Sequence, residues 1–403
     1  MVTNNRHCEE RSDEAIHLKK EIMEKEHYFD WAATSPADED ILKEALEETL
    51  ECWGNPSSTH AVGKKARELF EAARTRAAKA LGVKPETVFF TSGGTESDQI
   101  PLLSVLAKPM KGTVLVSSIE HPAIREQADA LKNCGWNVIQ IPSDSDGIIQ
   151  PEAVTSLITN DTVLICIMAV NNETGVIQPI YDIADAITKA CEGKRRPKFH
   201  VDCVQAAGKI NLNLSYKGID SAALSSHKIC GPRGIGILYL KDAIEPFLRG
   251  GGQEKGLRSG TENVFGAVAF SKCLERYFNK QNPSDADRTC RFVQKLAELP
   301  GCTIVPPGRL EKPALFSPYV VQAAFKNIPG NVMLRALDAK GFSISTGSAC
   351  SAKKNKRPVL EAMHVDPKLR ENAVRFSFGP HTTDNAVEDL LSAVKEVNMA
   401  FNQ

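Results

Sequence analysis

The fold of this chain is decided by the stretch LSSHKICGPRGIG, residues 224–236. Apolar residues precede it at 222–224 and follow it at 237–240, which predicts two strands that bracket Lys228. Most lysines are solvated surface groups, because a buried ammonium has to be desolvated or neutralised. Two serines, a histidine and a tight GPRG turn surround this one. A lysine in such a setting can act as a nucleophile near neutral pH and form a Schiff base.

Strands and helices alternate on the N-terminal side of this stretch. The alternation predicts an α/β fold with a largely parallel sheet, right-handed crossovers and helices on both faces. Ligands bind at the carboxyl ends of the strands in such sheets. The expected strands are 88–90, 114–116, 138–141, 163–170 and 199–202, and the expected helices are 41–50, 63–81, 181–191 and 262–279.

Four polar side chains each follow one of these strands: His121, Asn172, Asp202 and Lys228. Taken singly, the first three have ordinary explanations as a turn residue before proline, a turn amide and a strand-end acid. Because parallel strands end at the same edge of a sheet, we predict that all four meet there.

The segment TSGGTES, residues 91–97, follows the strand 88–90 and opens a helix. Free backbone N–H groups at such a helix start, with the Thr95 hydroxyl, can cradle a phosphate. The spacing matches neither the nucleotide P-loop nor the Rossmann fingerprint. Arg258 and Thr261 end a glycine-rich loop, residues 249–261, that is either a flexible linker or a second anion contact.

We expect three parts along the chain. Residues 1–27 are a charged extension, disordered or helical, and it is open whether residues 1–22 belong to the natural protein. Residues 28–281 form the large domain. Residues 282–403 form a smaller α+β domain, with a helix near 293–299, a strand near 320–325 and a closing helix at 384–401.

The second domain carries the segment GSAC, residues 347–350, among other small residues. Four basic residues just downstream favour the thiolate of Cys350, which is the reactive form. A buried, inert cysteine is the ordinary alternative. Arg375 interrupts an apolar strand and could hold a carboxylate through two hydrogen bonds.

Composition limits the possible partners. The chain has 403 residues, a net charge of −1 and eleven scattered cysteines without a Cys-x-x-Cys pair. We therefore expect no metal site, no nucleic-acid partner and no membrane span, and a reduced cytoplasmic location. A small polar substrate fits this balance.

With Lys228 and Cys350 both in place, the chain resembles the cysteine desulfurases of the class V aminotransferase family, the NifS and IscS type. The resemblance runs from about Tyr28 to the C-terminal helix. One departure is Ser226, where the family often has glycine. The motifs that carry the resemblance are FTSGGTES (90–97), VNNETG (170–175), HVDCVQ (200–205), SSHK (225–228), RSGT (258–261) and GSAC (347–350).

The resemblance implies a homodimeric fold-type I enzyme that uses pyridoxal 5'-phosphate. Lys228 would carry the cofactor as a Schiff base, Asp202 would pair with the pyridine nitrogen, His121 would stack on the ring, and Gln205 would bind the phenolic oxygen. The other implied contacts are Gly94, Thr95, Ser225 and His227 to the phosphate, Thr261 to the phosphate from the partner subunit, and Asn172 and Arg375 to the substrate carboxylate.

The implied reaction removes sulfur from L-cysteine and gives L-alanine. Cys350 would take the sulfur as a persulfide and pass it to a sulfur-acceptor protein for iron–sulfur cluster or other thio-cofactor assembly. Two alternatives stay open: a selenocysteine lyase or other class V enzyme on the same fold, and a non-catalytic scaffold for iron–sulfur assembly partners.

Overall fold

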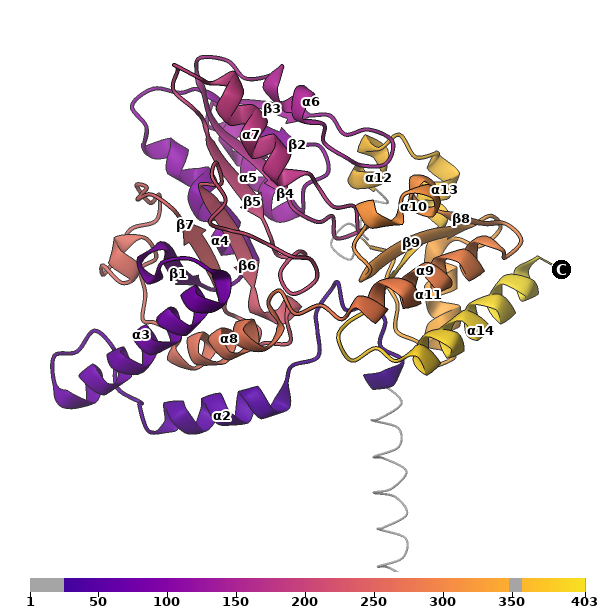
Figure 1. The fold of residues 1–403 in the computed structure, drawn as a ribbon, viewed down its shortest axis with the longest axis horizontal. Helices are drawn as coiled ribbons and strands as arrows, with labels where there is room; N and C mark the ends of the chain where they lie inside the picture. Colours follow the sequence, from indigo (N-terminus) through magenta and orange to yellow (C-terminus); the bar gives the residue numbers. More distant parts are fainter. Residues whose placement is uncertain (1–24, 348–356, 403) are drawn as a thin grey trace, which may run out of the picture.

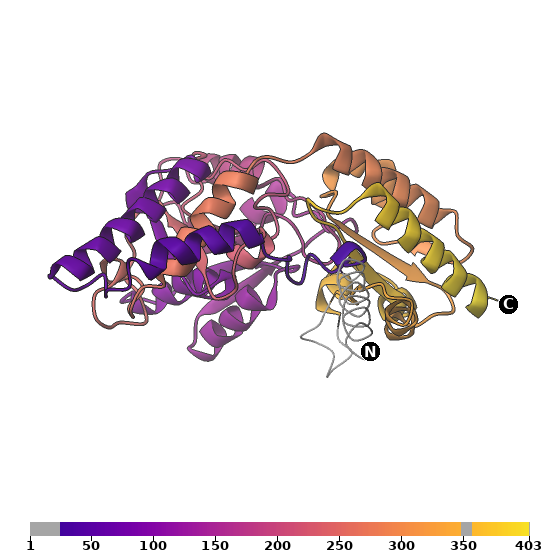
Figure 2. The ribbon, with the colours of Figure 1, turned by 90° about the horizontal axis from the view of Figure 1, so that it is seen from below.

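The computed structural model describes residues 25–347 and 357–402. Its two lobes lie side by side, the first built on a seven-stranded sheet and the second on a three-stranded sheet (Figures 1 and 2). The expected α/β class with a mostly parallel central sheet and a smaller C-terminal α+β unit is confirmed. The expected N-terminal extension lies almost wholly outside the described residues.

The large sheet has the strand order β1-β7-β6-β5-β4-β2-β3. All neighbours are parallel except β7, which runs antiparallel to both β6 and β1. The predicted strand pair around Lys228 is therefore the antiparallel pair β6 and β7. The strands are β1 (Val88–Thr91), β2 (Thr113–Ser117), β3 (Asn137–Ile141), β4 (Thr162–Met168), β5 (Lys198–Asp202), β6 (Ser221–Ser225) and β7 (Gly236–Leu240).

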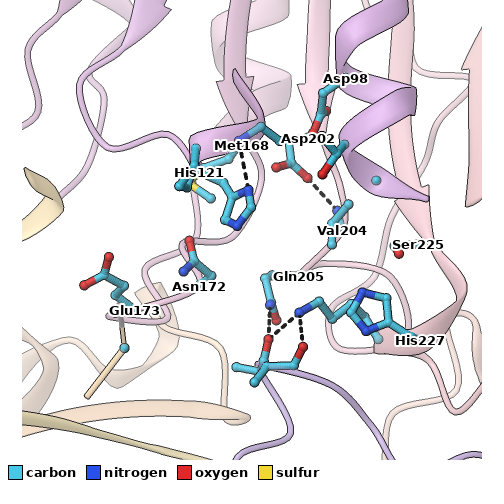
Figure 3. Close-up of a pocket in the computed structure, with 18 of the residues that line it drawn as sticks. Asp98, His121, Met168, Asn172, Glu173, Asp202, Val204, Gln205, Ser225 and His227 are labelled. Atoms are coloured by element: carbon cyan, nitrogen blue, oxygen red, sulfur yellow. Dashed lines mark hydrogen bonds between the residues drawn. The ribbon is translucent and has the colours of Figure 1, made fainter. Parts of the chain in front are cut away.

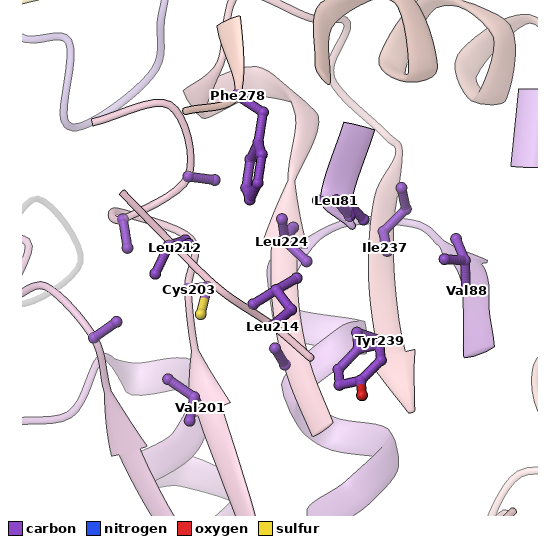
Figure 4. Packing of buried hydrophobic residues seen from close by; sticks show 14 of the residues in the cluster. Leu81, Val88, Val201, Cys203, Leu212, Leu214, Leu224, Ile237, Tyr239 and Phe278 are labelled. Atoms are coloured by element: carbon purple, nitrogen blue, oxygen red, sulfur yellow. The ribbon is translucent and has the colours of Figure 1, made fainter. Parts of the chain in front are cut away.

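Helices cover both faces of this sheet, because successive strand residues point to opposite sides. Leu115, Ile165 and Val201 pack toward α2, α3, α7 and α8, whereas Val114 and Leu164 pack toward α4 and α5. Figure 4 shows part of the first of these cores. The helices of this lobe are α2 (Glu39–Leu50), α3 (Ala61–Leu81), α4 (Gly94–Leu103), α5 (Pro122–Asn133), α6 (Pro151–Thr155), α7 (Ile180–Ala190) and α8 (Val264–Tyr277).

The second lobe is an antiparallel sheet in the order β10-β9-β8. One face packs on α9, α11 and α14, and the other meets the large lobe through α12 and α13. Its elements are α9 (Pro283–Ala297), β8 (Cys302–Ile304), α10 (Gly308–Glu311), β9 (Val320–Phe325), α11 (Gly330–Asp338), α12 (Pro358–Ala362), α13 (Pro367–Asn372), β10 (Ala373–Ser377) and α14 (Asp384–Phe401).

Two details of the second lobe differ from the expectation. The helix expected near 293–299 begins ten residues earlier, at Pro283, because Asn282 caps its first turn and proline favours the first helical position. Phe29 packs in the core of the small sheet, next to Phe378, although it precedes the large lobe in sequence. The N-terminal segment around Phe29 thus belongs to the second lobe by its packing. The domain boundary between residues 281 and 282 stays a proposal.

The described part of the chain offers no helix with both the length and the apolar character needed to cross a bilayer.

Candidate active site

A cavity of about 310 Å³ lies at the carboxyl ends of β2, β4, β5 and β6, which are neighbours in the sheet (Figure 3). The short connections after these strands therefore bring their polar side chains to one place. The cavity is lined by the expected residues Gly94, Thr95, His121, Asn172, Asp202, Gln205, Ser225, His227, Lys228 and Arg375.

Lys228 ends a short 3₁₀ turn, Ser226–Lys228, directly after β6. Its Nζ donates to the backbone oxygens of Ala32 and Ala33, both at 2.6 Å. Ser226 is fully buried, and its Oγ has no hydrogen-bond partner among the described residues. A Cβ at Gly231 would lie 1.9 Å from that Oγ, so a larger residue at 231 would force the buried Ser226 side chain to move. The tight turn thus keeps Lys228 at the cavity wall.

Asp202 is the last residue of β5 and is almost completely buried. Its Oδ1 accepts a hydrogen bond from the Val204 N–H at 2.8 Å. Burial and the nearby Asp98 carboxyl raise the Asp202 pKa to about 8. A buried acid of this kind becomes a carboxylate more readily when a cationic group binds beside it.

We expect Asp202→Asn to alter the pH dependence of stability in the ligand-free protein. The Asp202 pKa rises from near 4 to about 8 on folding, so its stabilising contribution is complete below about pH 4 and is lost as the pH rises to 8. Asparagine cannot ionise, so its variant does not lose this stability. Relative to the wild type, its free energy of unfolding should rise by up to about 1.4 kcal/mol for each pH unit in that window. Urea unfolding at several pH values measures this difference. Identical pH slopes for the two proteins would contradict it.

Asp98 and His200 form a buried pair beside Asp202 that the sequence analysis missed. His200 Nε2 lies 3.1 Å from Asp98 Oδ1, and His200 Nδ1 lies 2.8 Å from Ser221 Oγ. Burial lowers the His200 pKa to about 4, so this imidazole is neutral at physiological pH. The sequence signal for Asp98 was weak: a carboxyl group in the first turns of α4, on the side of the helix that faces the sheet.

His121 caps α5, and its Nδ1 accepts the Ala123 N–H at 3.1 Å. Burial, followed by the cationic groups of Lys228, Arg125 and Arg375, lowers its pKa to about 4. The ring is therefore neutral, and since Nδ1 is an acceptor, the proton lies on Nε2. His121 can offer the cavity an aromatic face and one N–H.

One end of the cavity suits a phosphate. Gly93, at φ 154°, precedes α4, and no side chain of the described residues caps this helix, so its first N–H groups are available to an anion. A Cβ at Gly94 would lie 2.6 Å from a methyl of Val204, so this approach requires glycine. His227 adds an imidazole whose pKa is lowered to about 4 by burial, with Nδ1 held 3.1 Å from Thr34 Oγ1.

The opposite end holds Arg375, a buried residue of β10. Its Nη2 donates to Asp30 Oδ1 at 2.6 Å and its Nη1 to the Asn172 backbone oxygen at 2.9 Å. Arg375 Nε and Asn172 Oδ1 are buried, and neither has a hydrogen-bond partner in the part of the chain that the structure describes. The expected two-point contact with a carboxylate therefore requires the ligand to displace Asp30 or to approach Nε.

The cavity also reaches Gly347, three positions before Cys350 in the sequence. Cys350 itself lies outside the described residues. Arg357, one of the four basic residues expected to favour its thiolate, is buried and donates to the backbone oxygens of Thr346 and Ala373. Its guanidinium also lies 3.8 Å from Glu173, which lines the cavity. Arg357 thus has partners of its own within the fold.

Thr261 does not line this cavity and is exposed on the loop before α8. That loop is anchored by Glu254, which receives two bonds from the buried Arg74, at 2.6 and 2.9 Å, and one from the Phe90 N–H at 2.7 Å. The alternative of a flexible linker is therefore wrong for the part of the loop around Glu254.

Comparison with known proteins covers both lobes. A family model described as "Aminotransferase class-V" matches residues 27–390. A NifS/IcsS protein homologue of Lactobacillus delbrueckii subsp. bulgaricus is 36% identical over 93% of this chain and 98% of its own length. The cysteine desulfurase IscS of Methanosarcina thermophila is 35% identical over 92% and 91% of the two chains. A solved NifS-like protein superposes with a TM-score of 0.84 at 35% identity, covering 93% of this chain and 99% of the other.

Proposed function

Since the chain belongs to the class-V aminotransferase family, we propose that it is a pyridoxal-phosphate-dependent cysteine desulfurase. It would convert L-cysteine to L-alanine and transfer the sulfur to Cys350. One observation carries this proposal: Lys228, Asp202 and His121 line the same cavity. The start of α4 and Gly347 line it too.

The side chains present fit pyridoxal phosphate. The start of α4 with Thr95, Ser225 and His227 would hold the phosphate, and Lys228 would supply the amine for the Schiff base. Asp202 would face the pyridine nitrogen, whose positive charge would offset the cost of ionising this buried acid. When bound, the cofactor supplies an electron sink for the bonds at the substrate's α carbon.

The chain's own residues would orient the substrate and move protons. Asn172 and Arg375 would hold the α-carboxylate, with Asp30 released from its pair. Lys228 would take the α proton, because its amine is the strand-end base at the cavity wall. The neutral His121, with its proton on Nε2, would offer an N–H to the reacting sulfur.

Sulfur transfer balances without another reactant. The Cys350 thiolate attacks the substrate sulfur and the carbon–sulfur bond breaks, with its electron pair returning to the β carbon. That carbon takes up one proton, which balances the proton that Cys350 lost on becoming a thiolate, and becomes the alanine methyl group. Cys350 is left as a persulfide for an acceptor protein.

The decisive experiment is to incubate the purified protein with L-cysteine and a reductant, and to measure alanine and sulfide together. We expect equal amounts of the two products and a visible absorption band from bound cofactor. A colourless protein that forms neither product would favour the scaffold alternative. Selenocysteine turnover without cysteine turnover would favour a selenocysteine lyase.

We also propose a homodimer in which Thr261 reaches the partner's cavity. Large apolar side chains are exposed on the large lobe, at Leu50 (66%), Trp53 (77%), Phe247 (59%) and Leu248 (71%). A dimer interface on this lobe would cover exposed apolar side chains of this kind.

Mixing two inactive or impaired variants tests the dimer. A subunit with Lys228→Ala keeps Thr261, and a subunit with Thr261→Val keeps Lys228, so a mixed dimer contains one complete site. After subunit exchange about half of the dimers should be mixed, each with one complete site of two, so we expect the mixture to regain about a quarter of the wild-type activity. Activity no higher than the average of the separate variants would contradict a site shared between subunits.

We propose that the protein works in the cytoplasm with a sulfur-acceptor protein, and that neither nucleic acid nor a membrane is its partner. The cysteines that the structure describes are free thiols, as expected in a reducing compartment. The net charge of −1 does not favour nucleic-acid binding in the way that a strongly basic chain would.

A further inference from the structure

A second buried lysine, Lys209, lies behind the cavity in the turn that follows β5. Only 8% of the residue is exposed. Its Nζ donates to Gln205 Oε1 at 2.5 Å, and no carboxylate within ion-pair distance of it occurs in the described part of the chain. Burial, then the charges of Lys228 and Arg375, lower the Lys209 pKa to about 7, while the Cys230 thiol acts weakly in the opposite direction. Burying an amine at this position costs desolvation free energy. Its contact with Gln205 is therefore the place to look for its role.

That contact fixes the amide of Gln205. An ammonium has only donors, so the amide group that faces the charged form of Lys209 must be the oxygen. The Gln205 Nε2 then lies on the other side, where it donates to the Ala32 backbone oxygen at 2.8 Å (Figure 3). If the amide were flipped, the N–H groups of Gln205 would face the N–H groups of the Lys209 ammonium. Neutral or charged, the Lys209 amine stays a donor to this oxygen.

The same carbonyl joins the amide to the catalytic lysine. Ala32 O accepts from Gln205 Nε2 and also from Lys228 Nζ, the latter at 2.6 Å. Lys209, Gln205 and Lys228 are thus linked in one short series of hydrogen bonds. Because an amide nitrogen carries two hydrogens, Gln205 keeps one N–H for a ligand in the cavity that it lines.

We infer that Lys209 is a positioning residue, which holds Gln205 so that its N–H, and not its carbonyl oxygen, faces the phenolic oxygen of the cofactor. The inference rests on the proposed pyridoxal-phosphate function. A donor at the phenolic oxygen stabilises negative charge there and weakens the affinity of the neighbouring Lys228 nitrogen for a proton. With the amide free to turn, its oxygen would repel that negative charge.

Lys209→Met tests this role, because methionine keeps the length of the side chain and removes the donor. The readout is the pH midpoint of the visible absorption of the bound cofactor. We expect the midpoint to rise by about one pH unit, which is the effect of losing the hydrogen bond from Gln205 to the charged phenolic oxygen. The dissociation constant of the cofactor should rise by about tenfold. Lys209→Arg, which keeps a donor, should restore the wild-type midpoint.

Two further variants separate orientation from loss of charge. Lys280 lines the same second cavity as Lys209, one of about 300 Å³, but it donates to the Glu275 backbone oxygen. Lys280→Met should leave the midpoint unchanged. In a Gln205→Leu background, where there is no amide to orient, Lys209→Met should shift the midpoint by less than a third of its effect in the wild type.

An equal shift in both backgrounds would overturn the inference, as would an unchanged midpoint in Lys209→Met. If Lys209→Met does not fold, Lys209→Leu provides the same comparison with a shorter apolar side chain that also lacks a donor. A wild-type protein without any visible band would refute the proposed function itself, an outcome distinct from a band that Lys209 does not affect.

Discussion

Lys228→Ala should abolish turnover of L-cysteine. No other lysine among the described residues lines the first cavity, so the variant loses both the amine that would hold the cofactor and the base that would take the α proton. We expect the rate to fall by about 10³-fold or more. The fold should survive, because the Nζ bonds to the Ala32 and Ala33 backbone oxygens lie at the cavity wall.

Covalent attachment of the cofactor gives a second measurement. Borohydride treatment of the wild type should add the cofactor's mass to the peptide that contains Lys228, and the alanine variant should remain unlabelled. Lys280→Met is the matched control, because it removes a lysine that does not line the first cavity and should still be labelled at Lys228. Normal turnover in Lys228→Ala, or label on another lysine, would show that the catalytic amine lies elsewhere.

The large lobe could be predicted because its signals are local. Strand-length apolar runs alternate with the helical spacing of segments such as Ala61–Leu81, and chain connectivity then makes most of the sheet parallel. Polar residues directly after the strands fall at one edge of such a sheet. His121, Asn172, Asp202 and Lys228 therefore line one cavity, as the strand-end argument predicted.

The remaining features depend on contacts between distant segments. Phe29 joins the core of the small sheet, and Asp30 pairs with Arg375, 345 positions away. Nothing in the local pattern distinguishes Lys209 from a surface lysine, because its burial depends on the packing of the turn after β5. The same holds for Asp98, whose partner His200 comes from another element. Such pairs set the protonation and orientation of the predicted site residues.

Cys350→Ser should stop sulfur release while leaving cofactor and substrate binding intact. The cavity residues Lys228, Asp202 and Arg375 are unchanged in this variant, so L-cysteine should still alter the visible spectrum of the bound cofactor. A hydroxyl is a poor nucleophile toward sulfur near neutral pH, so we expect sulfide formation to fall by about 10²-fold or more. Cys134→Ser is the matched control, because Cys134 is a free, exposed thiol outside the cavity and its loss should change nothing.

Mass spectrometry of the wild type identifies the sulfur carrier. After addition of L-cysteine, the peptide that contains Cys350 should gain one sulfur atom that a reductant removes, and the peptide that contains Cys134 should not. The carbon–selenium bond is weaker than the carbon–sulfur bond, so selenocysteine turnover that survives in Cys350→Ser would show that the nucleophile is needed for sulfur alone. An unmodified Cys350 peptide, together with undiminished cysteine turnover in Cys350→Ser, would refute persulfide transfer through this residue and leave the assignment of Lys228 unaffected.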